Sequence, residues 1–245
     1  MTVAFSPMFT LDVALTPRLY SLYAHPDSVV VVIDILRATT AICTAFENGV
    51  EKMIPVATLE EAWAYREKGY LLGAERNGEK IEGADFGNSP YDYMGDHLKG
   101  KTTVITTTNG TRAIEMSKDS HQVIIGSFVN IDVVVNHLIQ SKRNVVLLCA
   151  GWKEKFNLED TMFAGALVDR LAEHEQFADV SDAALIARYL YANAMEDPYH
   201  FLKNSSHRKR MQKLNLKEDI RYSLNPERSE IIPVLKNGAL VQLSR

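Results

Sequence analysis

The sequence predicts an α/β protein built on a largely parallel or mixed sheet with helices packed against it. Three apolar, β-branched runs, 29–33, 102–105 and 145–148, each stop at a cluster of small or polar residues and continue as a helical pattern. Runs that are apolar throughout are typical of parallel strands covered on both faces, and their alternation with helices indicates βαβ units. Because parallel strands deliver their carboxyl ends to one edge of a sheet, we expect the three clusters to form a shared ligand-binding crevice.

The first half of the chain contains four expected strands and two expected helices. The strands are 9–15, 29–33, 52–56 and 70–72, and the helices are 38–48 and 58–68. Thr58 and Glu61 have the spacing of a capping box, which marks the start of the second helix. The segment 73–90 follows no periodic pattern, and a stretch of this length is usually functional or flexible. Ser89 and Pro90 favour a new helix start.

The second half continues the alternation as far as Glu173 and then changes. The expected strands are 102–106, 122–125 and 145–149, and the expected helices are 111–117, 131–140 and 159–172. A helical pattern at 182–195 and a basic helical pattern at 198–213 follow, and 231–243 is expected to form a hairpin about Asn237-Gly238. We expect one α/β domain over 1–245, and a C-terminal helical and hairpin subdomain at about 174–245 stays open.

Composition excludes several classes of protein. The 245 residues are 46% apolar, which supports a large core, and the net charge of −4 argues against non-specific binding of nucleic acid. No run approaches the roughly 20 apolar residues that span a bilayer, and the first 25 residues lack the features of a signal peptide. Cys43 and Cys149 make no disulfide framework. A cytoplasmic location is the simplest expectation.

Asp34 stands where the apolar run 29–33 ends, and Arg37 follows three residues later. A carboxylate at that place loses solvation unless a positive group meets it, and Arg37 is within reach along the first turn of the helix. Two interpretations stay open. Asp34 is either a helix cap in a structural ion pair, or a divalent-cation ligand or general base beside an arginine that binds an anionic oxygen.

The cluster 106–112 is rich in hydrogen-bond donors. Thr107, Thr108 and Asn109 supply polar side chains, and Gly110 relaxes the backbone at a helix start, where free amides and the helix dipole favour phosphate. In the structural alternative, Asn109 caps the helix and the threonines belong to the strand.

Carboxylates in the 73–90 loop and after the third strand are candidate metal ligands. Carboxylate and amide oxygens suit Mg²⁺, which usually keeps waters and also binds phosphate oxygens of the substrate. Glu75 and Asp85 are the leading candidates. Beyond the third strand, Asp160 could cap a helix, orient a water molecule or bind metal, and Lys153 could bind an anion.

Cys149 and the basic run 205–210 each allow two interpretations. A thiolate nucleophile would resemble the cysteine phosphatases, which need an arginine six residues later, where this chain has Lys155. A small buried residue that closes a strand is therefore the favoured interpretation of Cys149. In the basic run, His207 and Arg210 share one helical face and either lie in solvent or close over an anionic substrate.

At these residues the chain resembles the 2-phosphosulfolactate phosphatases of coenzyme M biosynthesis. The resemblance covers about residues 30–240 and includes Ser206-His207 and Leu214 in the tail. The matching stretches are VIDILRATT (32–40), GAER (73–76), DFGNSP (85–90), TTNGT (107–111), CAG (149–151) and ED (159–160).

The resemblance implies a Mg²⁺-dependent acid phosphatase that hydrolyses 2-phospho-3-sulfolactate to 3-sulfolactate and phosphate. It implies a three-layer α/β/α fold and leaves a homodimer open. The expected partner is a small anionic phosphorylated substrate, with no nucleic acid and no membrane. Two alternatives stay open: a phosphatase for another small phosphorylated carboxylic acid, and a non-catalytic protein that binds a phosphorylated ligand.

A mechanism follows from these residues. Asp34, with Glu75 or Asp85, would hold Mg²⁺, while Arg37 and the amides of 107–110 neutralise developing charge. We expect direct attack by water, with Asp160 or Asp34 as base. An Asp34 nucleophile would resemble the haloacid-dehalogenase-type phosphatases, which place a second Asp two residues on, where this chain has Leu36.

The remaining candidates bind substrate. Arg76, Lys153 and His207 are expected to bind a sulfonate or carboxylate. Thr39, Asn88 and Ser89, which lie in the matching stretches, complete the expected set of phosphate- and substrate-binding residues.

Overall fold

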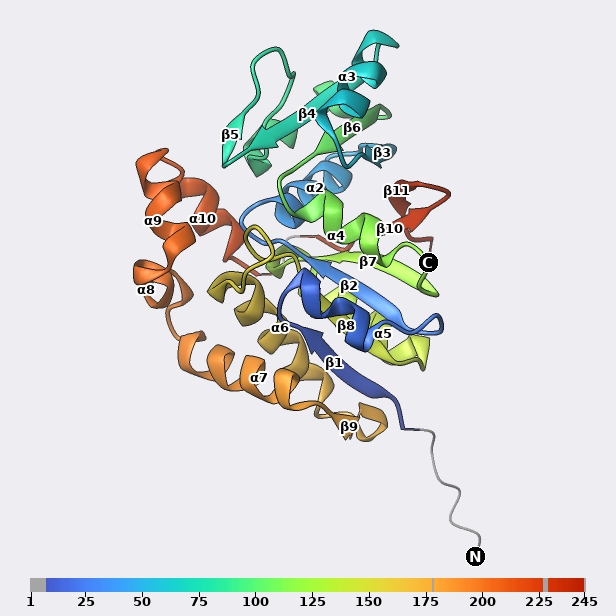
Figure 1. Ribbon diagram of the computed structural model, residues 1–245, viewed down its shortest axis with the longest axis vertical. Helices are drawn as coiled ribbons and strands as arrows, with labels where there is room; N and C mark the ends of the chain where they lie inside the picture. Colours follow the sequence, from blue (N-terminus) through green and yellow to red (C-terminus); the bar gives the residue numbers. More distant parts are fainter. Residues whose placement is uncertain (1–7, 178, 227–228, 245) are drawn as a thin grey trace, which may run out of the picture.

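In a computed structural model that describes residues 8–177, 179–226 and 229–244, the chain forms one mixed sheet with helices on both of its faces (Figure 1). The order of the strands in the described residues is β5-β4-β6-β3-β11-β10-β7-β2-β8-β1-β9. Their bounds are β1 (Thr10–Ala14), β2 (Val29–Ile33), β3 (Lys52–Pro55), β4 (Leu71–Arg76), β5 (Glu79–Lys80), β6 (Thr102–Thr106), β7 (Gln122–Gly126), β8 (Val145–Cys149), β9 (Asp179–Val180), β10 (Pro233–Lys236) and β11 (Ala239–Gln242). The α/β class with a mixed sheet is confirmed.

The helices follow the predicted alternation closely. Their bounds are α1 (Tyr20–Tyr23), α2 (Ala38–Glu47), α3 (Leu59–Glu67), α4 (Gly110–Ser117), α5 (Ile131–Ser141), α6 (Leu158–Leu171), α7 (Asp182–Ala194), α8 (Pro198–Phe201), α9 (Ser206–Lys213) and α10 (Lys217–Ser223). The capping box at the start of α3 is confirmed, because Glu61 N donates to Thr58 Oγ1 and Thr58 N donates to Glu61 Oε2.

A hairpin from the end of the chain joins two groups of parallel strands. The strands β7, β2, β8, β1 and β9 form one parallel group, and β3, β6 and β4 form the other. The antiparallel strands β10 and β11 lie between β7 and β3. Their turn is the predicted Asn237-Gly238 pair, with φ of 50° and 76°, as a type I′ turn requires. The hairpin therefore lies in the middle of the sheet.

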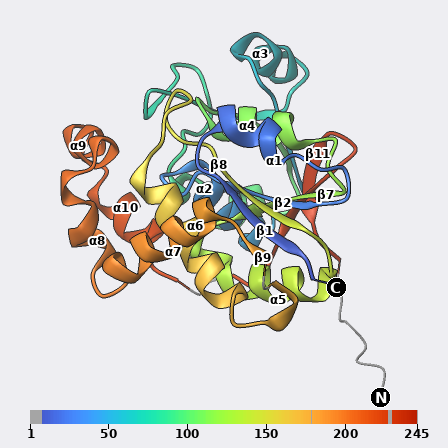
Figure 2. The ribbon, with the colours of Figure 1, turned by 60° about the horizontal axis from the view of Figure 1, so that its bottom comes forward.

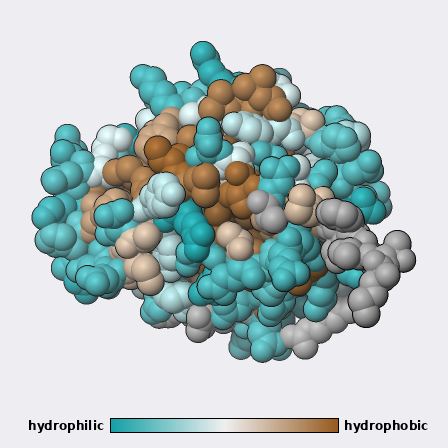
Figure 3. Space-filling view, turned by 90° about the horizontal axis from the view of Figure 1, so that it is seen from below, coloured by the Kyte–Doolittle hydropathy of each residue, from teal (hydrophilic) through white to brown (hydrophobic). Residues whose placement is uncertain are grey.

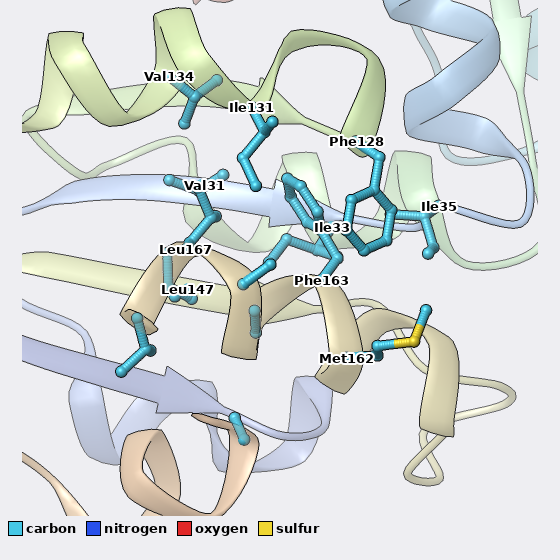
Figure 4. Packing of buried hydrophobic residues seen from close by; sticks show 14 of the residues in the cluster. Val31, Ile33, Ile35, Phe128, Ile131, Val134, Leu147, Met162, Phe163 and Leu167 are labelled. Carbon is cyan, nitrogen blue, oxygen red and sulfur yellow. The ribbon is translucent and has the colours of Figure 1, made fainter. Parts of the chain in front are cut away.

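The central strand β2 contributes side chains to a hydrophobic core on each face of the sheet. Val29, Val31 and Ile33 belong to one core, and Val30 and Val32 belong to the other. Figure 4 shows the first core, where β2 and β8 pack against residues of α5 and α6. The second core lies against α2 and α4, and Figure 2 shows helices above and below the strands. Burial on both faces explains why β2 is apolar throughout.

Two predictions about local structure were wrong. The segment 73–90 is not structureless from its start, because β4 continues to Arg76 in parallel with β6 and turns back into β5. The basic pattern 198–213 is two helices rather than one. Ser205 is extended, and its hydroxyl accepts from Arg208 N at 3.0 Å, so it ends one helical segment and caps α9.

Among the described residues, no helix is long and apolar enough to cross a membrane. The face seen from below in Figure 3 is largely hydrophilic, with an apolar area near its centre. Large side chains exposed on α7 include Ile186 and Tyr189.

We predict that Gly165→Ala destabilises the protein, because α6 and α7 touch there. A Cβ atom at Gly165 would lie 2.0 Å from the carbonyl oxygen of Ala187, so the two helices must separate. The expected loss of unfolding free energy is about 1–3 kcal/mol, measured by urea denaturation. Ala192→Ser, at an exposed position of α7, is the control and should change it by less than about 0.5 kcal/mol. Equal stability of the two variants would contradict the packing of α6 on α7.

Candidate functional site

The turns that follow β2, β6 and β8 converge, as the sequence predicts. A Cβ atom at Gly110, after β6, would lie 3.1 Å from Asp34 Oδ2, after β2. Lys153 N, after β8, donates to Asn109 Oδ1 at 3.0 Å. A Cβ atom at Gly110 would also lie 2.8 Å from the Cβ of Ala38, so the close approach of α2 and of the Asp34 carboxylate explains why this position has no side chain.

A small cavity lies where these turns meet. Its volume is about 20 Å³, which is room for about one water molecule. Its walls come from the strand-end turns, from the β4–β5 turn and from α9. The lining residues are Asp34, Leu36, Arg37, Glu75, Gly78, Asn88, Asn109, Trp152, His207 and Met211.

The Asp34 carboxylate is buried without a partner of opposite charge. It is 6% exposed, and no hydrogen-bond donor among the described residues reaches its oxygens. Burial raises the pKa of Asp34 well above its ordinary value of 3.8, and the neighbouring carboxylates of Asp160, Glu75 and Glu159 raise it further, while His207 lowers it. The site therefore favours a proton or a cation beside Asp34.

Arg37 does not pair with Asp34, so the interpretation of Asp34 as part of a structural ion pair with Arg37 does not hold. Its Nη1 donates to Asp219 Oδ2 of α10 at 2.6 Å, and its Nη2 donates to the carbonyl oxygen of Gly78 at 2.7 Å. The Leu36–Arg37 peptide bond is cis. Arg37 and Asp219 are both buried, so this pair ties α10 to the turn after β2. Sequence analysis missed Asp219, which lies 182 residues away.

Glu75 connects the end of β4 to the turn after β6. Its carboxylate accepts from Gly78 N and from the Thr108 hydroxyl, the latter at 3.1 Å. Thr108 N also points at Glu75 Oε2, at 3.4 Å. Glu75 is buried and lines the cavity.

The structure does not bring Asp85 to Asp34 and Glu75. Asp85 forms an ion pair with Arg66 of α3 and accepts from Leu72 N at 2.8 Å. Asp85 is not among the residues that line the cavity. Its carboxylate holds α3 and the loop against β4.

Asp160 is fully buried and positions the strand ends. It accepts from Ile35 N at 3.0 Å, Gly151 N at 3.0 Å and Asn157 Nδ2 at 2.8 Å. Asn157 caps α6 by accepting from Asp160 N. Asp160 is absent from the cavity lining, so the structure gives it a place in the scaffold and not beside a bound water.

The threonines of the expected phosphate cradle bond mainly to their neighbours. Thr107 N donates to Thr111 Oγ1, and Thr111 N donates in return to Thr107 Oγ1. Asn109 precedes α4 but makes no capping hydrogen bond with its side chain. Of this cluster, Asn109 alone lines the cavity among the described residues.

Other predicted binders divide between the scaffold and the cavity. Thr39 Oγ1 accepts from Asp34 N at 3.2 Å, and Arg76 donates to Glu75 O and Thr106 Oγ1. Ser89 caps the 3₁₀ turn Pro90–Tyr93. The contacts of these three residues stabilise turns around the site.

Asn88 and Lys153 have groups left for a ligand. Asn88 lines the cavity, and its Oδ1 is buried without a hydrogen-bond partner. The Lys153 side chain is exposed, and its ammonium lies 5.5 Å from the centre of the Trp152 ring.

His207 is held at the cavity by a glutamate that sequence analysis did not select. His207 Nδ1 lies 2.5 Å from Glu159 Oε1, and its ring lies 5.6 Å from that of Trp152. Glu159 is fully buried. Such a carboxylate fixes the orientation of the imidazole and leaves Nε2 for another partner. The signal that could have identified Glu159 is its position beside Asp160 in the first turn of α6.

The cavity has oxygen atoms that suit a hard cation. Among the described residues, no three His, Cys, Asp or Glu side chains converge as in a complete protein cage. Mg²⁺ is usually bound by one or two carboxylates, with water and phosphate oxygens completing its shell. The unpaired Asp34 carboxylate, Glu75 and the unpartnered Asn88 Oδ1 line one cavity and match that pattern.

Cys149 ends β8 and is fully buried. Burial raises the pKa of the Cys149 thiol well above its ordinary value of 9.0, and the nearby Asp160 carboxylate raises it further. This environment suppresses the thiolate, in agreement with the structural interpretation of Cys149.

Comparisons with known proteins point to one family. Residues 14–238 match the family model described as 2-phosphosulpholactate phosphatase. Proteins named probable 2-phosphosulfolactate phosphatase are similar over most of their length. The one from Thermotoga petrophila is 41% identical over 86% of this chain and 90% of that protein. The one from Caldanaerobacter subterraneus subsp. tengcongensis is 38% identical over 85% of this chain and 88% of that protein.

Both cysteine thiols should be unreactive in the folded protein. Cys43 is buried, and desolvation raises the pKa of its thiol to about 12. We expect no colour with Ellman's reagent at pH 8, and two equivalents once guanidinium unfolds the chain. A rapid native reaction that Cys149→Ser abolishes would instead indicate an accessible thiolate.

The raised pKa of Asp34 predicts that stability depends on pH. The unfolded chain ionises Asp34 near pH 3.8, but the folded chain keeps its proton to higher pH, so metal-free stability falls as pH rises between the two pKa values. Asp34→Asn removes this loss. With chelator present, thermal melting should therefore find the variant more stable than wild type at pH 8, with a smaller decrease from pH 5.

Asp96→Asn, at an exposed position, is the matched control and should melt like wild type at both pH values. An Asp34→Asn variant that is less stable than wild type at pH 8 would show that Asp34 supports the fold as an ionised group.

Proposed function

The chain belongs to the 2-phosphosulfolactate phosphatase family, and from this premise we propose that it hydrolyses 2-phospho-3-sulfolactate to 3-sulfolactate and phosphate. The family is one of phosphoric monoester hydrolases. The observation that carries the proposal is the buried, unpaired Asp34 carboxylate at the meeting point of three strand-end turns. In a protein that only bound an anion, this carboxylate would lower the affinity for the anion, because like charges repel.

Mg²⁺ is the cation that we propose for this site. Asp34 and Glu75 would hold it, with Asn88 Oδ1 as a neutral oxygen ligand. When bound, the ion would neutralise charge on the phosphoryl oxygens and make a water molecule more acidic. It would also offset the repulsion among the buried carboxylates.

Arg37 supplies fixed positive charge on the other side of the cavity. A guanidinium has five N–H groups, and the contacts with Asp219 and Gly78 leave donors for a phosphoryl oxygen. Because Asp219 holds the arginine in place beforehand, little side-chain entropy is lost when substrate binds. Arg37 therefore stabilises charge as it develops on the phosphoryl group.

His207 is positioned to serve the oxygen that leaves. Glu159 holds Nδ1, so Nε2 is free to hydrogen bond with the ester oxygen of a bound substrate. The alkoxide that forms when the P–O bond breaks must gain a proton, and an imidazolium, which carries a hydrogen on both ring nitrogens, would donate it from Nε2. Glu159 acts here as a positioning residue.

The substrate reaches the cavity through a larger depression beside it. This depression has a volume of about 490 Å³ and shares Arg37, Gly78 and Asn88 with the cavity. Its other walls are the β4–β5 turn and the segment after α9, including Leu214 and Leu216. We infer that α9 and the β4–β5 turn move apart to admit the phosphate group, because the closed cavity holds about one water molecule.

The test is release of phosphate from 2-phospho-3-sulfolactate, with Mg²⁺ and with chelator. We expect turnover with the metal only, and Asp34→Asn should lower it about 100- to 1,000-fold, as loss of an electrostatic group at the reacting centre does. Cys149→Ser should retain a rate near that of wild type.

Circular dichroism of each variant separates loss of chemistry from loss of fold. Phospholactate and phosphoglycerate, assayed beside the sulfonated substrate, show which phosphorylated acid the enzyme prefers. Binding of substrate without phosphate release under either condition would overturn the proposal, as would full activity of Asp34→Asn.

A further inference from the structure

Arg210 of α9 has an unusual environment for an arginine. Its Nε and Nη2 atoms are buried, and no hydrogen-bond partner reaches either of them within the described residues. Burial lowers the pKa of its guanidinium, while Glu159 raises it. Burying the donors of a charged group without acceptors costs free energy. This side of Arg210 therefore has room in its chemistry for a partner from outside the chain.

The unpartnered atoms lie on the edge of the guanidinium that recognises oxyanions. The Nε and Nη2 hydrogens point in parallel and can bind two oxygens of one carboxylate, sulfonate or phosphate. Trp152 provides an apolar surface for the guanidinium, because the Arg210 guanidinium carbon lies 4.1 Å from the centre of the Trp152 ring. This contact with the ring face holds the guanidinium in place without using its Nε and Nη2 hydrogens.

Arg210 also lies next to the catalytic cavity. It follows His207 by three residues on α9, so the two side chains share a helical face. Both contact Trp152, and Trp152 and His207 line the cavity. A small molecule with its phosphate at Asp34 and Arg37 would extend past His207 toward Arg210.

The neighbouring Arg208 is anchored to α8, although its Nε is also buried without a hydrogen-bond partner among the described residues. Its Nη1 donates to the carbonyl oxygen of Tyr199 at 2.9 Å, and its guanidinium stacks on the Tyr199 ring at 3.6 Å. Arg208 therefore holds α9 to α8. Lys209, between the two arginines, is exposed. Arg210 is the arginine of this run that faces the Trp152 ring.

We propose that Arg210, which lies over the Trp152 ring, binds one of the two acid groups that the substrate carries apart from its phosphate, the sulfonate or the carboxylate. This inference rests on the proposed function and deepens it, because it assigns the recognition of one of these two acid groups to one side chain. The bound oxyanion takes the Nε and Nη2 hydrogens as a two-pronged pair. The positive charge of Arg210 also reduces the repulsion between that acid group and the buried Glu159.

The test compares four substrates on four proteins. The substrates are phosphosulfolactate, phospholactate with a carboxylate only, the phosphate ester of 2-hydroxyethanesulfonate with a sulfonate only, and p-nitrophenyl phosphate with neither. The proteins are wild type, Arg210→Gln, Arg210→Lys and Lys209→Gln. Lys209→Gln removes the same charge from the same helix at an exposed position and is the matched control.

We expect Arg210→Gln to lower kcat/KM for phosphosulfolactate about 10- to 100-fold relative to p-nitrophenyl phosphate, mainly through KM, as loss of charged hydrogen bonds does. One of the two singly acidic substrates should show the same selective loss, and it identifies the group that Arg210 binds. Arg210→Lys should recover only part of the activity, because lysine cannot form the two-pronged pair. Lys209→Gln should match wild type on all four.

An equal loss on all four substrates, or no loss at all, would overturn the assignment of Arg210. If wild type hydrolyses none of them, the proposed function fails, and direct binding then tests the inference alone. Trp63→Phe leaves Trp152 as the sole tryptophan, so added 3-sulfolactate should change its fluorescence. Arg210→Gln in that background should raise the apparent Kd about tenfold or more, and an unchanged Kd would exclude the subsite.

Discussion

The arrangement of the site depends on one electrostatic constraint, the burial of the Asp34 carboxylate among other carboxylates. Glu75, Glu159 and Asp160 all act to raise its pKa, and Arg37, three residues away, pairs with Asp219 instead. A folded protein accepts such a group only if function requires it or if a cation offsets it. The neighbouring geometry follows from this constraint, including a Gly110 backbone that approaches Asp34 without a side chain and a closed, water-sized cavity in front of it.

Two carboxylates hold the strand ends together around the cavity: Glu75 lines it, and Asp160 lies outside its lining. Asp160 bonds to Ile35 N and Gly151 N, which follow β2 and β8, and Glu75 bonds to Thr108 after β6. Each of these hydrogen bonds joins segments that are far apart in the sequence. Contacts between residues that are neighbours in the sequence could not hold these segments together. The scaffold and the proposed chemistry thus use the same residue types, and burial and hydrogen-bond partners distinguish the two uses.

The sheet and the C-terminal helices each contribute charged or polar side chains to the site. The strand-end turns bring Asp34 and Glu75, while α9 brings His207 and Arg210 (Figure 1). The anchor for Arg37 also comes from this arm, through Asp219 of α10. An anionic substrate with a cation between it and the carboxylates would be held from both sides. Closing of α9 over the substrate would then couple binding to completion of the site.

The sequence by itself determined the α/β class, most element bounds, the β10–β11 turn and the meeting of three strand ends, because each depends on local hydrophobic period or turn chemistry. It also identified Asp34, Arg37 and His207 as residues of one site. Only the tertiary structure decided that Asp85 pairs with Arg66, that Asp160 supports the scaffold, and that Asp219 and Glu159 hold Arg37 and His207. The physical reason is that a carboxylate has the same appearance in sequence wherever it lies, and its role depends on which distant donors the fold brings to its oxygens.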